Sequence, residues 1–380
     1  MLVHQMDVVT TFLNGNLDEE IYMQQPEGYI KPGEKHLVCK LEKSLYGLKQ
    51  APRCWNKAFG EYIKNIGFVQ SSGDACVHIK RQETLTIIAV YVDDLILLAE
   101  NTIEMLKIKD DLSKKFLLKD MGELHYCLGI TIIQDKKNKQ IFLNQHQYIK
   151  KILQRFGQTE AKVVTTPADM SVKLVKQDGV SKSVDSTYYQ SIIGSLLYVA
   201  IATRPDISQA VRVLSKFCAS PTEAHLTAAK RVLRYLKGTE NLSLRFKKSV
   251  SETFIGYSDA DWAGDLDDRH STSGNLFILA NGTISWMSKK QATVALSTAE
   301  SEYVALSQAT QEAIWLRRLL KDLGMFIDQP TVIHEDNKGA ISIARNPVFH
   351  GRTKHIDIRS LFIRASIQLG AIDVKYFPSI

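Results

Sequence analysis

Two adjacent aspartates separate two apolar runs in the stretch LTIIAVYVDDLILLA, residues 85–99. The runs have the length and the β-branched composition of buried strands, and the short polar interval between them predicts a tight antiparallel hairpin. A charged carboxylate beside a buried sheet is costly unless its charge has a partner, and residues 91–100 contain no lysine or arginine. Asp93 and Asp94 therefore either face solvent, as aspartates in turns commonly do, or share a divalent cation such as Mg²⁺ with other acids.

Length and composition indicate a globular protein with more than one core. The chain has 380 residues, of which 44% are hydrophobic and 23% charged, and this size is sufficient for two or three domains. No apolar run reaches the ~18 residues of a membrane span, and the first residues lack the basic-then-apolar order of a signal peptide. The five cysteines form no CxxC pair, which argues against a disulfide framework or a zinc site. We therefore expect an intracellular protein with no membrane partner.

The first part of the chain, residues 1–135, mixes short apolar strands with helical patterns such as the one at 101–116. Strands are predicted at 85–92, 95–100 and 128–133, and the helix at 101–116. This mixture is typical of an α+β domain built on an antiparallel sheet.

The second and third parts differ from each other in pattern. Residues 136–250 read mainly as helices, whereas residues 251–380 return to strands. The elements predicted in the third part are strands at 252–264, 275–288 and 331–336 and a helix at 297–324. The whole chain is thus predicted to have an α+β fold, with its last domain boundary near residue 250.

Basic residues are concentrated in the middle part. Residues 136–250 hold 20 lysines and arginines against 7 aspartates and glutamates, a net charge of +13, whereas the whole chain carries +7. The two flanking parts together are therefore acidic. A basic region between acidic ones fits a nucleic-acid grip between catalytic regions, and it equally fits a solvated helical surface.

The clearest helical pattern spans residues 220–238. We expect Ser220 to cap this helix, Glu223 to complete a capping box and Gly238 to end it. The apolar residues that line one face are Leu226, Ala229, Leu233 and Leu236. The basic residues that form a stripe on another face are Lys230, Arg234 and Lys237. The apolar face would pack, and the basic stripe could follow a phosphate backbone.

Two further motifs precede the acidic hairpin in a fixed order. MDVVTTFLNG at 6–15 places Asp7 at the end of an apolar strand, and KSLYGLKQAPRCW at 43–55 lies between it and YVDD. This ordered set resembles the reverse transcriptase palm of copia-type retrotransposon Pol polyproteins. The resemblance continues through HYCLGITI at 125–132 and YYQSIIGSLLYVAIATRPDIS at 188–208, and it covers essentially the whole chain.

The resemblance implies an RNA-directed DNA polymerase that extends a DNA primer on an RNA template with deoxynucleoside triphosphates. Asp7 and Asp93 would hold two Mg²⁺ ions about 4 Å apart, with Asp94 contributing less directly. Phe12 would exclude a ribose 2′-hydroxyl, although a core aromatic fits the same position. Lys119 would protonate the leaving pyrophosphate, or else it is a solvated lysine at a helix end.

The resemblance also implies contacts to template and primer. The residues that would position the template and the nascent pair are Gly47, Lys49, Gln50 and Pro52. The residues that would place the primer terminus are Leu128, Gly129 and Ile130, although a plain sheet turn explains this segment too. Arg204 is either a contact to the nucleic-acid backbone or a buried structural arginine.

A second acidic cluster follows the basic part. YSDADWAGD at 257–265, STAESEY at 297–303 and HEDNKGA at 334–340 resemble the first three catalytic motifs of ribonuclease H. The residues that match the family's carboxylates are Asp259, Glu302 and Asp336, which would bind two Mg²⁺ ions and cleave the RNA strand of an RNA–DNA hybrid. The acids expected to be solvated instead are Asp261, Asp265 and Glu300.

The resemblance thus implies a palm at 1–135, a basic helical thumb and connection at 136–250, and a ribonuclease H-like mixed α/β domain at 251–380. It places the protein in a cytoplasmic virus-like particle or in the nucleus.

We expect a fingers subdomain before Asp7 and a fourth ribonuclease H carboxylate near the end to be missing. Asp357 could replace that carboxylate or lie on the surface. The missing segments could be supplied in trans or by a homodimer. The alternatives to an enzyme are a catalytically silent nucleic-acid-binding remnant and a non-functional reading frame.

Overall fold

Two compact units make up the chain in a computed structural model. The model describes residues 1–176, 179–248, 253–325, 327–345 and 354–378. Unit 1 comprises 1–124 with 318–325, and unit 2 comprises 125–317 with 326–380.

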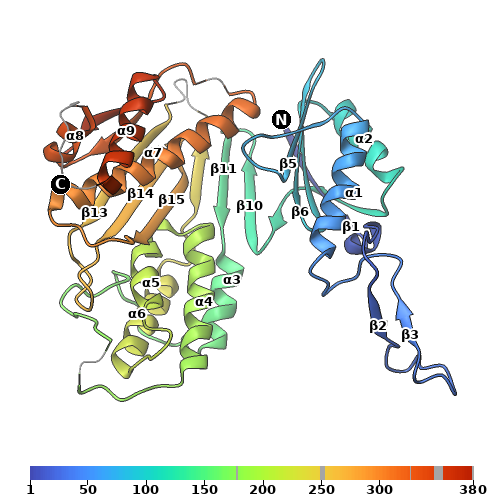
Figure 1. Ribbon diagram of the computed structural model, residues 1–380, viewed down its shortest axis with the longest axis horizontal. Helices are drawn as coiled ribbons and strands as arrows, with labels where there is room; N and C mark the ends of the chain where they lie inside the picture. The colour runs from blue at the N-terminus through green and yellow to red at the C-terminus, as the bar shows by residue number, and fades with distance from the viewer. Residues whose placement is uncertain (177–178, 249–252, 326, 346–353, 379–380) are drawn as a thin grey trace. The chain divides into compact units, whose positions relative to one another are not determined.

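Unit 1 is built on a six-stranded antiparallel sheet with the strand order β4-β5-β6-β7-β1-β8. Its strands are β1 (Leu2–Val8), β4 (Val69–Gln70), β5 (Val77–Arg81), β6 (Leu85–Tyr91), β7 (Asp94–Ala99) and β8 (Leu118–Glu123). Its helical elements are η1 (Thr11–Asn14), α1 (Ala51–Asn65) and α2 (Thr102–Ser113). Two further strands, β2 (Tyr22–Gln24) and β3 (Val38–Lys40), pair only with each other and extend away from this sheet (Figure 1).

The core of unit 1 lies between one face of this sheet and the two helices. Leu95, Leu97 and Ala99 of β7 are fully buried, because alternate residues of a strand point to the same face. They pack with Phe59 of α1 and Leu112 of α2 in one hydrophobic cluster. The residues between them in sequence, beginning with Asp94, therefore point to the other face of the sheet.

Unit 2 contains a five-stranded mixed sheet with the order β15-β14-β13-β16-β17, in which β16 runs parallel to both of its neighbours. Its strands are β13 (Ile255–Asp261), β14 (Thr272–Leu279), β15 (Gly282–Lys290), β16 (Thr331–Glu335) and β17 (Ile372–Tyr376). The helices that follow these strands in the chain are α7 (Thr298–Asp322), α8 (Lys338–Arg345) and α9 (Lys354–Gln368). The prediction of one strand at 275–288 is wrong, because Ala280 and Asn281 adopt φ values of 52° and 59° and turn the chain into a hairpin.

Unit 2 also contains a helical cluster and a second antiparallel sheet. The strands of that sheet, in the order β12-β11-β10-β9, are β9 (Tyr126–Cys127), β10 (Ile130–Asp135), β11 (Gln140–Asn144) and β12 (Leu244–Lys247). The helices are α3 (His146–Arg155), α4 (Ser186–Ala202), η2 (Pro205–Ile207), α5 (Ser208–Ser215) and α6 (Glu223–Gly238). Their apolar faces meet in a single core, which includes the predicted apolar face of α6.

Helix α6 begins later than its sequence predicts. Its capping box is formed by Thr222 and His225, not by Ser220 and Glu223. The reason is tertiary, because Thr222 forms a β-bridge with Ser183 and is held in extended conformation there. The helix can therefore start only after that bridge.

The α+β class predicted from the sequence is confirmed by these antiparallel sheets and their helices. The first segment of unit 1 ends at Leu124, and the hairpin of β9 and β10 belongs to unit 2. The predicted boundaries at 135 and 250 do not coincide with this division, so the three-domain organisation stays a prediction. Within the described ranges, no helix is both long enough and apolar enough to cross a membrane.

Candidate functional site

The acidic hairpin has a two-residue turn that is held from both sides. Tyr91 and Asp94 pair across β6 and β7, which leaves Val92 and Asp93 at the tip. The indole N–H of Trp55 donates to the Val92 carbonyl at 2.9 Å, and the Val8 N–H donates to the Asp93 carbonyl at 2.8 Å. Val92 has a φ of 55°, a conformation that costs a β-branched residue about 1–2 kcal/mol. These two hydrogen bonds therefore fix the tip in a shape that its own sequence disfavours.

Trp55 is a residue whose role the sequence did not reveal. It lies at the end of the motif at 43–55, and it is 3% exposed. Its ring packs against Phe59 and Phe116, while its N–H reaches the hairpin carbonyl. The position of Trp55 at the end of a motif hints at a role, but the sequence does not identify its partner. The hydrogen bond joins positions that are 37 residues apart in the chain.

Three charged residues lie side by side across three strands of unit 1. Asp7 on β1 pairs with Asp94 on β7 and with Lys119 on β8. Paired residues on adjacent strands share a face, and here it is the face opposite the hydrophobic core. Lys119 is exposed and lies in a strand, so the interpretation as a lysine at a helix end is wrong.

Asp94 is the most constrained acid of this group. The Gln5 side-chain amide donates to its Oδ1 at 2.7 Å. Burial raises the pKa of Asp94, the hydrogen bond from Gln5 lowers it, and the nearby charges of Asp93 and Asp7 raise it further. The carboxylate oxygens of Asp7, Asp93 and Asp94 do not all lie within 4.8 Å of one another, whereas a second group of acids in the described part of the chain meets this distance.

The residues predicted to position the template surround the start of α1. Gly47 has a φ of 94°, and Pro52 lies in the first turn of the helix. Lys49 is exposed, whereas the Gln50 amide donates to the carboxylate of Glu19 at 3.0 Å.

Phe12 is in the short helix η1, directly after β1. It is half-buried and packs against the core of unit 1, and its ring meets Tyr46 edge-on at 4.7 Å. The aromatic pair links the motif at 6–15 to the motif at 43–55.

The segment predicted to place the primer terminus is a tight hairpin turn between β9 and β10. Leu128 and Gly129 adopt φ values of 50° and 74°, and Ile130 begins β10. The Tyr198 hydroxyl of α4 donates to the Leu128 carbonyl, and a Cβ on Gly129 would lie 3.3 Å from that hydroxyl. Glycine is needed here both for the backbone conformation and for the close approach of the tyrosine.

The second group of acids converges at one end of the five-stranded sheet. Asp259 near the end of β13, Glu302 in α7 and Asp336 directly after β16 bring ligand oxygens within 4.8 Å of one another. Because β13 and β16 are parallel and Tyr257 pairs with His334, the two aspartates leave neighbouring strands at the same level and on the same face.

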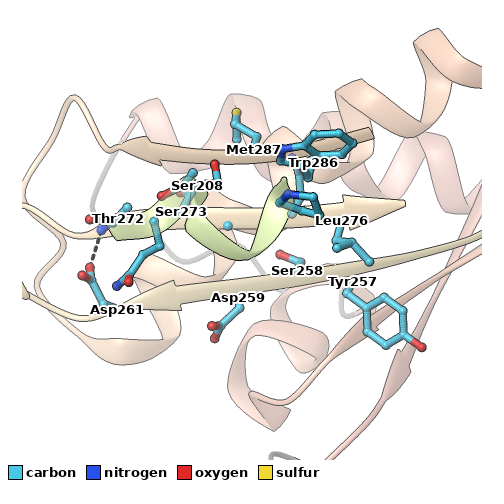
Figure 2. Close-up of a pocket in the computed structure, with 15 residues that line it drawn as sticks. Ser208, Tyr257, Ser258, Asp259, Asp261, Thr272, Ser273, Leu276, Trp286 and Met287 are labelled. Atoms are coloured by element: carbon cyan, nitrogen blue, oxygen red, sulfur yellow. Dashed lines mark hydrogen bonds between the residues drawn. The ribbon is translucent and has the colours of Figure 1, made fainter. Parts of the chain in front are cut away.

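A pocket of about 320 Å³ opens beside Asp259. Its lining includes Tyr257, Leu276 and Trp286 of the sheet and Ser208 of α5 (Figure 2). Asp259 is exposed, so a substrate that enters from this side can reach its carboxylate.

Burial dominates the electrostatics of Glu302. Glu302 is 7% exposed, and its Oε2 has no hydrogen-bond partner among the described residues. Burial raises the pKa of Glu302 to about 9, and the charges of Glu335, Asp259 and Asp336 add to this effect. Burial and the charge of Asp336 also raise the pKa of Asp259. An oxygen-only group with an unpartnered buried carboxylate suits a hard divalent cation such as Mg²⁺.

Glu335 is a further acid in this region that the sequence analysis did not single out. It is 1% exposed, and burial raises its pKa to about 8. The sequence signal for Glu335 is strand alternation, because Thr331, Ile333 and Glu335 occupy alternate positions of β16 and so share one face. In the structure all three residues are buried.

Of the three acids expected in solvent, Asp261 is exposed and Glu300 is partly exposed, and each also accepts a backbone hydrogen bond. Asp261 accepts a hydrogen bond from the Thr272 N–H (dashed line in Figure 2), and Glu300 accepts one from the Leu296 N–H at 2.8 Å. Asp265 is 7% exposed, so its predicted solvation is wrong.

Asp265 is stabilised by two lysines that are distant in sequence. Lys290 and Lys216 lie 2.5 Å and 3.1 Å from its carboxylate. Burial opposes ionisation, but these two lysines hold the pKa of Asp265 well below its usual range.

The basic stripe of α6 is partly occupied by the chain itself. Arg234 donates to the Lys162 carbonyl at 2.6 Å, and Lys237 donates to the Ala161 carbonyl at 3.0 Å. Lys230 lies on the same helix and is half-buried. Much of this stripe therefore fastens the segment before α4.

Arg204 is a buried structural arginine, which settles the alternative left open by the sequence. It is 2% exposed, forms two hydrogen bonds with the Asp206 carboxylate and also donates to Thr239. The side chain of Asp357, the predicted substitute for a lost carboxylate, lies outside the described residues.

An antiparallel sheet with a paired-acid hairpin, joined in one chain to a three-carboxylate site on a mixed sheet, defines the reverse transcriptase class of polymerases. The family described as "Reverse transcriptase (RNA-dependent DNA polymerase)" matches residues 1–170. The Ty5-1 transposon protein of Saccharomyces cerevisiae is 36% identical over its entire length and 81% of this chain. The chain belongs to the reverse transcriptase family of retrotransposon Pol polyproteins, and the resemblance seen in its motifs is confirmed.

Plant relatives match almost the whole chain. The Retrovirus-related Pol polyprotein from transposon TNT 1-94 of Nicotiana tabacum is 43% identical over 96% of the chain. The corresponding polyprotein from transposon RE1 of Arabidopsis thaliana is 44% identical over 98%. The chain spans only 28% and 25% of the lengths of these two relatives.

Solved structures support the fold. The foamy viral protease-reverse transcriptase in complex with an RNA/DNA hybrid matches all of this chain and 44% of its own, with a TM-score of 0.56 and 14% identity. The same protein in complex with dsDNA matches with a TM-score of 0.55 over 68% of that chain. At this identity the likeness concerns the fold alone.

Proposed function

We propose that this chain is an RNA-directed DNA polymerase with a ribonuclease H site. The observation that carries the proposal is the convergence of Asp259, Glu302 and Asp336 from three separate elements onto one point, in a chain whose first 170 residues match the reverse transcriptase family. A chain of this kind would copy retrotransposon RNA into DNA and degrade the RNA of the resulting hybrid.

At the polymerase site, the hairpin acids would hold the metal and orient the primer end. Asp7 and Asp93 are the proposed ligands, and Asp94 is restrained by Gln5 behind them. Mg²⁺ bound there would supply Lewis-acid stabilisation of the charge on the transferred phosphoryl group. Lys119, which pairs with Asp7 across β1 and β8, would give a proton to the leaving pyrophosphate.

At the nuclease site, the three carboxylates would bind Mg²⁺, and the buried Glu302 supplies an oxygen with no other partner. The pocket beside Asp259 leaves the scissile strand access to that carboxylate. The partners that follow are an RNA template, a DNA primer, deoxynucleoside triphosphates and an RNA–DNA hybrid.

Primer extension on an RNA template with Mg²⁺ tests the polymerase. Asp93→Asn should lower the rate at least about 100-fold, because a metal ligand is lost. Asp110→Asn is the matched control, since Asp110 is an exposed acid on α2 of the same unit. Extension that is unchanged in Asp93→Asn would refute the assignment of the hairpin.

Cleavage of labelled RNA in an RNA–DNA hybrid tests the nuclease separately. Asp259→Asn should abolish it, while Asp328→Asn, an exposed acid before β16, should leave it intact. Hybrid binding without extension or cleavage would replace the enzyme with the binding remnant, and salt-dependent affinity would identify phosphate contacts.

A further inference from the structure

Three neighbouring strands of unit 2 place polar residues in a row on the buried face of the five-stranded sheet. Asn275 of β14, Ser258 of β13 and Glu335 of β16 are 7%, 6% and 1% exposed. Ser258 pairs with Asn275. Tyr257 of β13 pairs with His334 of β16. Ser258 and Glu335 are the next residues along these two parallel strands, so they are neighbours across them. We call these three residues the polar row.

The polar row faces the apolar core of the sheet. Phe277 and Ile333, two residues from Asn275 and Glu335 on the same strands, are completely buried. Asp259 lies one residue beyond Ser258 on β13, so it points to the opposite face. The row therefore lies behind Asp259, and Glu335 directly precedes Asp336 at the end of β16.

Helix α7 brings Glu302 to the same buried face. The Gln291 side chain donates to the hydroxyl of Ser273, which is two residues from Asn275 on β14, and also to the Ser301 carbonyl in the first turns of α7. These two hydrogen bonds fix the start of the helix over the row. Among its neighbouring charges, Glu335 raises the pKa of Glu302 most.

Three buried oxygens of this region have no hydrogen-bond partner among the described residues, and they are Asn275 Oδ1, Glu335 Oε2 and Glu302 Oε2. The Ser258 side chain lies beside the Glu335 carboxyl and lowers its pKa, and the Asn337 N–H donates to Glu335 Oε1 at 3.2 Å. Polar atoms buried without partners are rare in folded proteins and costly. A set of them directly behind a group of metal-type ligands indicates a layer that orients those ligands.

We propose that Glu335 is a positioning residue of the nuclease site, which together with Ser258 supports the Glu302 carboxylate from behind and directs its free oxygen toward Asp259 and Asp336. The proposal rests on the function proposed above. Glu335 does not contact the substrate itself. Its effect passes through the orientation of Glu302, and so it should appear first in metal affinity.

Manganese binding to the full chain, measured by titration calorimetry, tests this role without reference to activity. The Mn²⁺ binding that Asp259→Asn removes is assigned to the three-carboxylate site. Loss of an orienting partner lowers metal affinity by about 10–100-fold, and we expect this loss for Glu335→Leu. Glu335→Gln keeps the shape and the hydrogen-bonding groups, so its affinity should stay within about threefold of the wild type.

Two further variants keep the test decisive if Glu335→Leu fails to fold. Ser258→Ala removes only a hydroxyl from the polar row and should still weaken Mn²⁺ binding measurably. Thr310→Val is the matched control, because Thr310 is a fully buried polar residue two turns further along α7 whose hydroxyl bonds only its own helix. Its Mn²⁺ affinity should equal that of the wild type.

The outcomes separate the two proposals. Wild-type protein with no Mn²⁺ binding sensitive to Asp259→Asn would overturn the proposed metal site itself. If Glu335→Leu folds and binds Mn²⁺ as strongly as the wild type, only the positioning role is overturned. If Glu335→Leu does not fold, wild-type Mn²⁺ affinity in Ser258→Ala has the same meaning. Equal losses in Glu335→Gln and Glu335→Leu would overturn the positioning role as well, because the conservative change would not have rescued binding.

Discussion

Replacing the Glu302 carboxyl by an amide should stabilise the metal-free protein at alkaline pH. The folded state holds the pKa of Glu302 at about 9, against an ordinary value of 4.5. Since the folded pKa is raised, the folded state keeps a proton that the unfolded chain has lost. The stabilising contribution is therefore complete below pH 4.5 and disappears as the pH rises toward 9.

The size of the effect follows from that difference. A pH of 8 lies about 3.5 units above the ordinary pKa of this carboxyl, and the folded state still holds the proton there. At about 1.4 kcal/mol per pH unit, keeping the proton lowers the free energy of unfolding by up to about 5 kcal/mol. The amide of Glu302→Gln does not titrate and escapes this cost. In a unit of this size about 1 kcal/mol shifts the melting temperature by about 2–4 °C, so the variant should melt well above the wild type at pH 8.

Thermal unfolding in EDTA at pH 5 and pH 8 measures this difference. Hydrogen exchange of residues 255–261 reports on β13 alone and so separates unit 2 from unit 1. The gap between variant and wild type should be large at pH 8 and should fall to about 1 kcal/mol or less at pH 5. Mg²⁺ at 100 times its dissociation constant should then increase the free energy of unfolding of the wild type by about 2.7 kcal/mol and so raise its melting temperature, whereas the variant should stay unchanged.

A matched variant in the same helix controls this experiment. Glu300 lies two residues earlier in α7 and already has a backbone partner in the Leu296 N–H. Glu300→Gln should show no gap that depends on pH. An equal gap at pH 5 and pH 8 for Glu302→Gln would refute the reasoning, because the effect would then not come from a titrating carboxyl.

Three further variants test contacts that lie within unit 1 or within unit 2. Trp55→Phe removes the donor to the Val92 carbonyl, so it should cost about 1–3 kcal/mol and slow primer extension. Arg204→Met leaves the carboxylate of Asp206 without its buried partner and should cost about 3–5 kcal/mol in chemical denaturation. Gly129→Ala forces a side chain into a φ of 74° and should cost about 1–2 kcal/mol, visible as faster hydrogen exchange of the turn. Wild-type stability in any one of these variants would contradict the contact assigned to it.

Much of the local structure was predictable because its causes are local. The alternation of apolar residues in β7 and the short polar interval before it determine the hairpin of β6 and β7. Helix α2 begins where expected, since Asn101 caps it through the Glu104 N–H. The long helix at 297–324 was likewise found, as α7. In each case neighbours within a few residues settle the conformation.

The acids of the candidate nuclease site were also identified in the sequence, but only by their resemblance to a family. Their spacing along the chain contains no information on whether they meet. The parallel pairing of β13 with β16 and the position of α7 bring Asp259, Glu302 and Asp336 together. Sheet topology, which depends on long-range pairing, decides that convergence.

Other features depended entirely on tertiary structure. Asp265 is buried because Lys216 and Lys290, both distant in sequence, neutralise its charge. Arg204 has its charged partner Asp206 only two residues away, but its hydrogen bond to the Thr239 carbonyl depends on the fold. The alternation of β16 puts Glu335 on the same face as Thr331 and Ile333, but only the fold shows that its charge acts on Glu302. The sequence alone determined the hairpin of β6 and β7, the helices α2 and α7 and the identity of the acids, because these depend on local periodicity and motif. Which charges are buried, paired or left facing one another was decided only in the folded chain, because the free energy of a charge depends on what surrounds it in space.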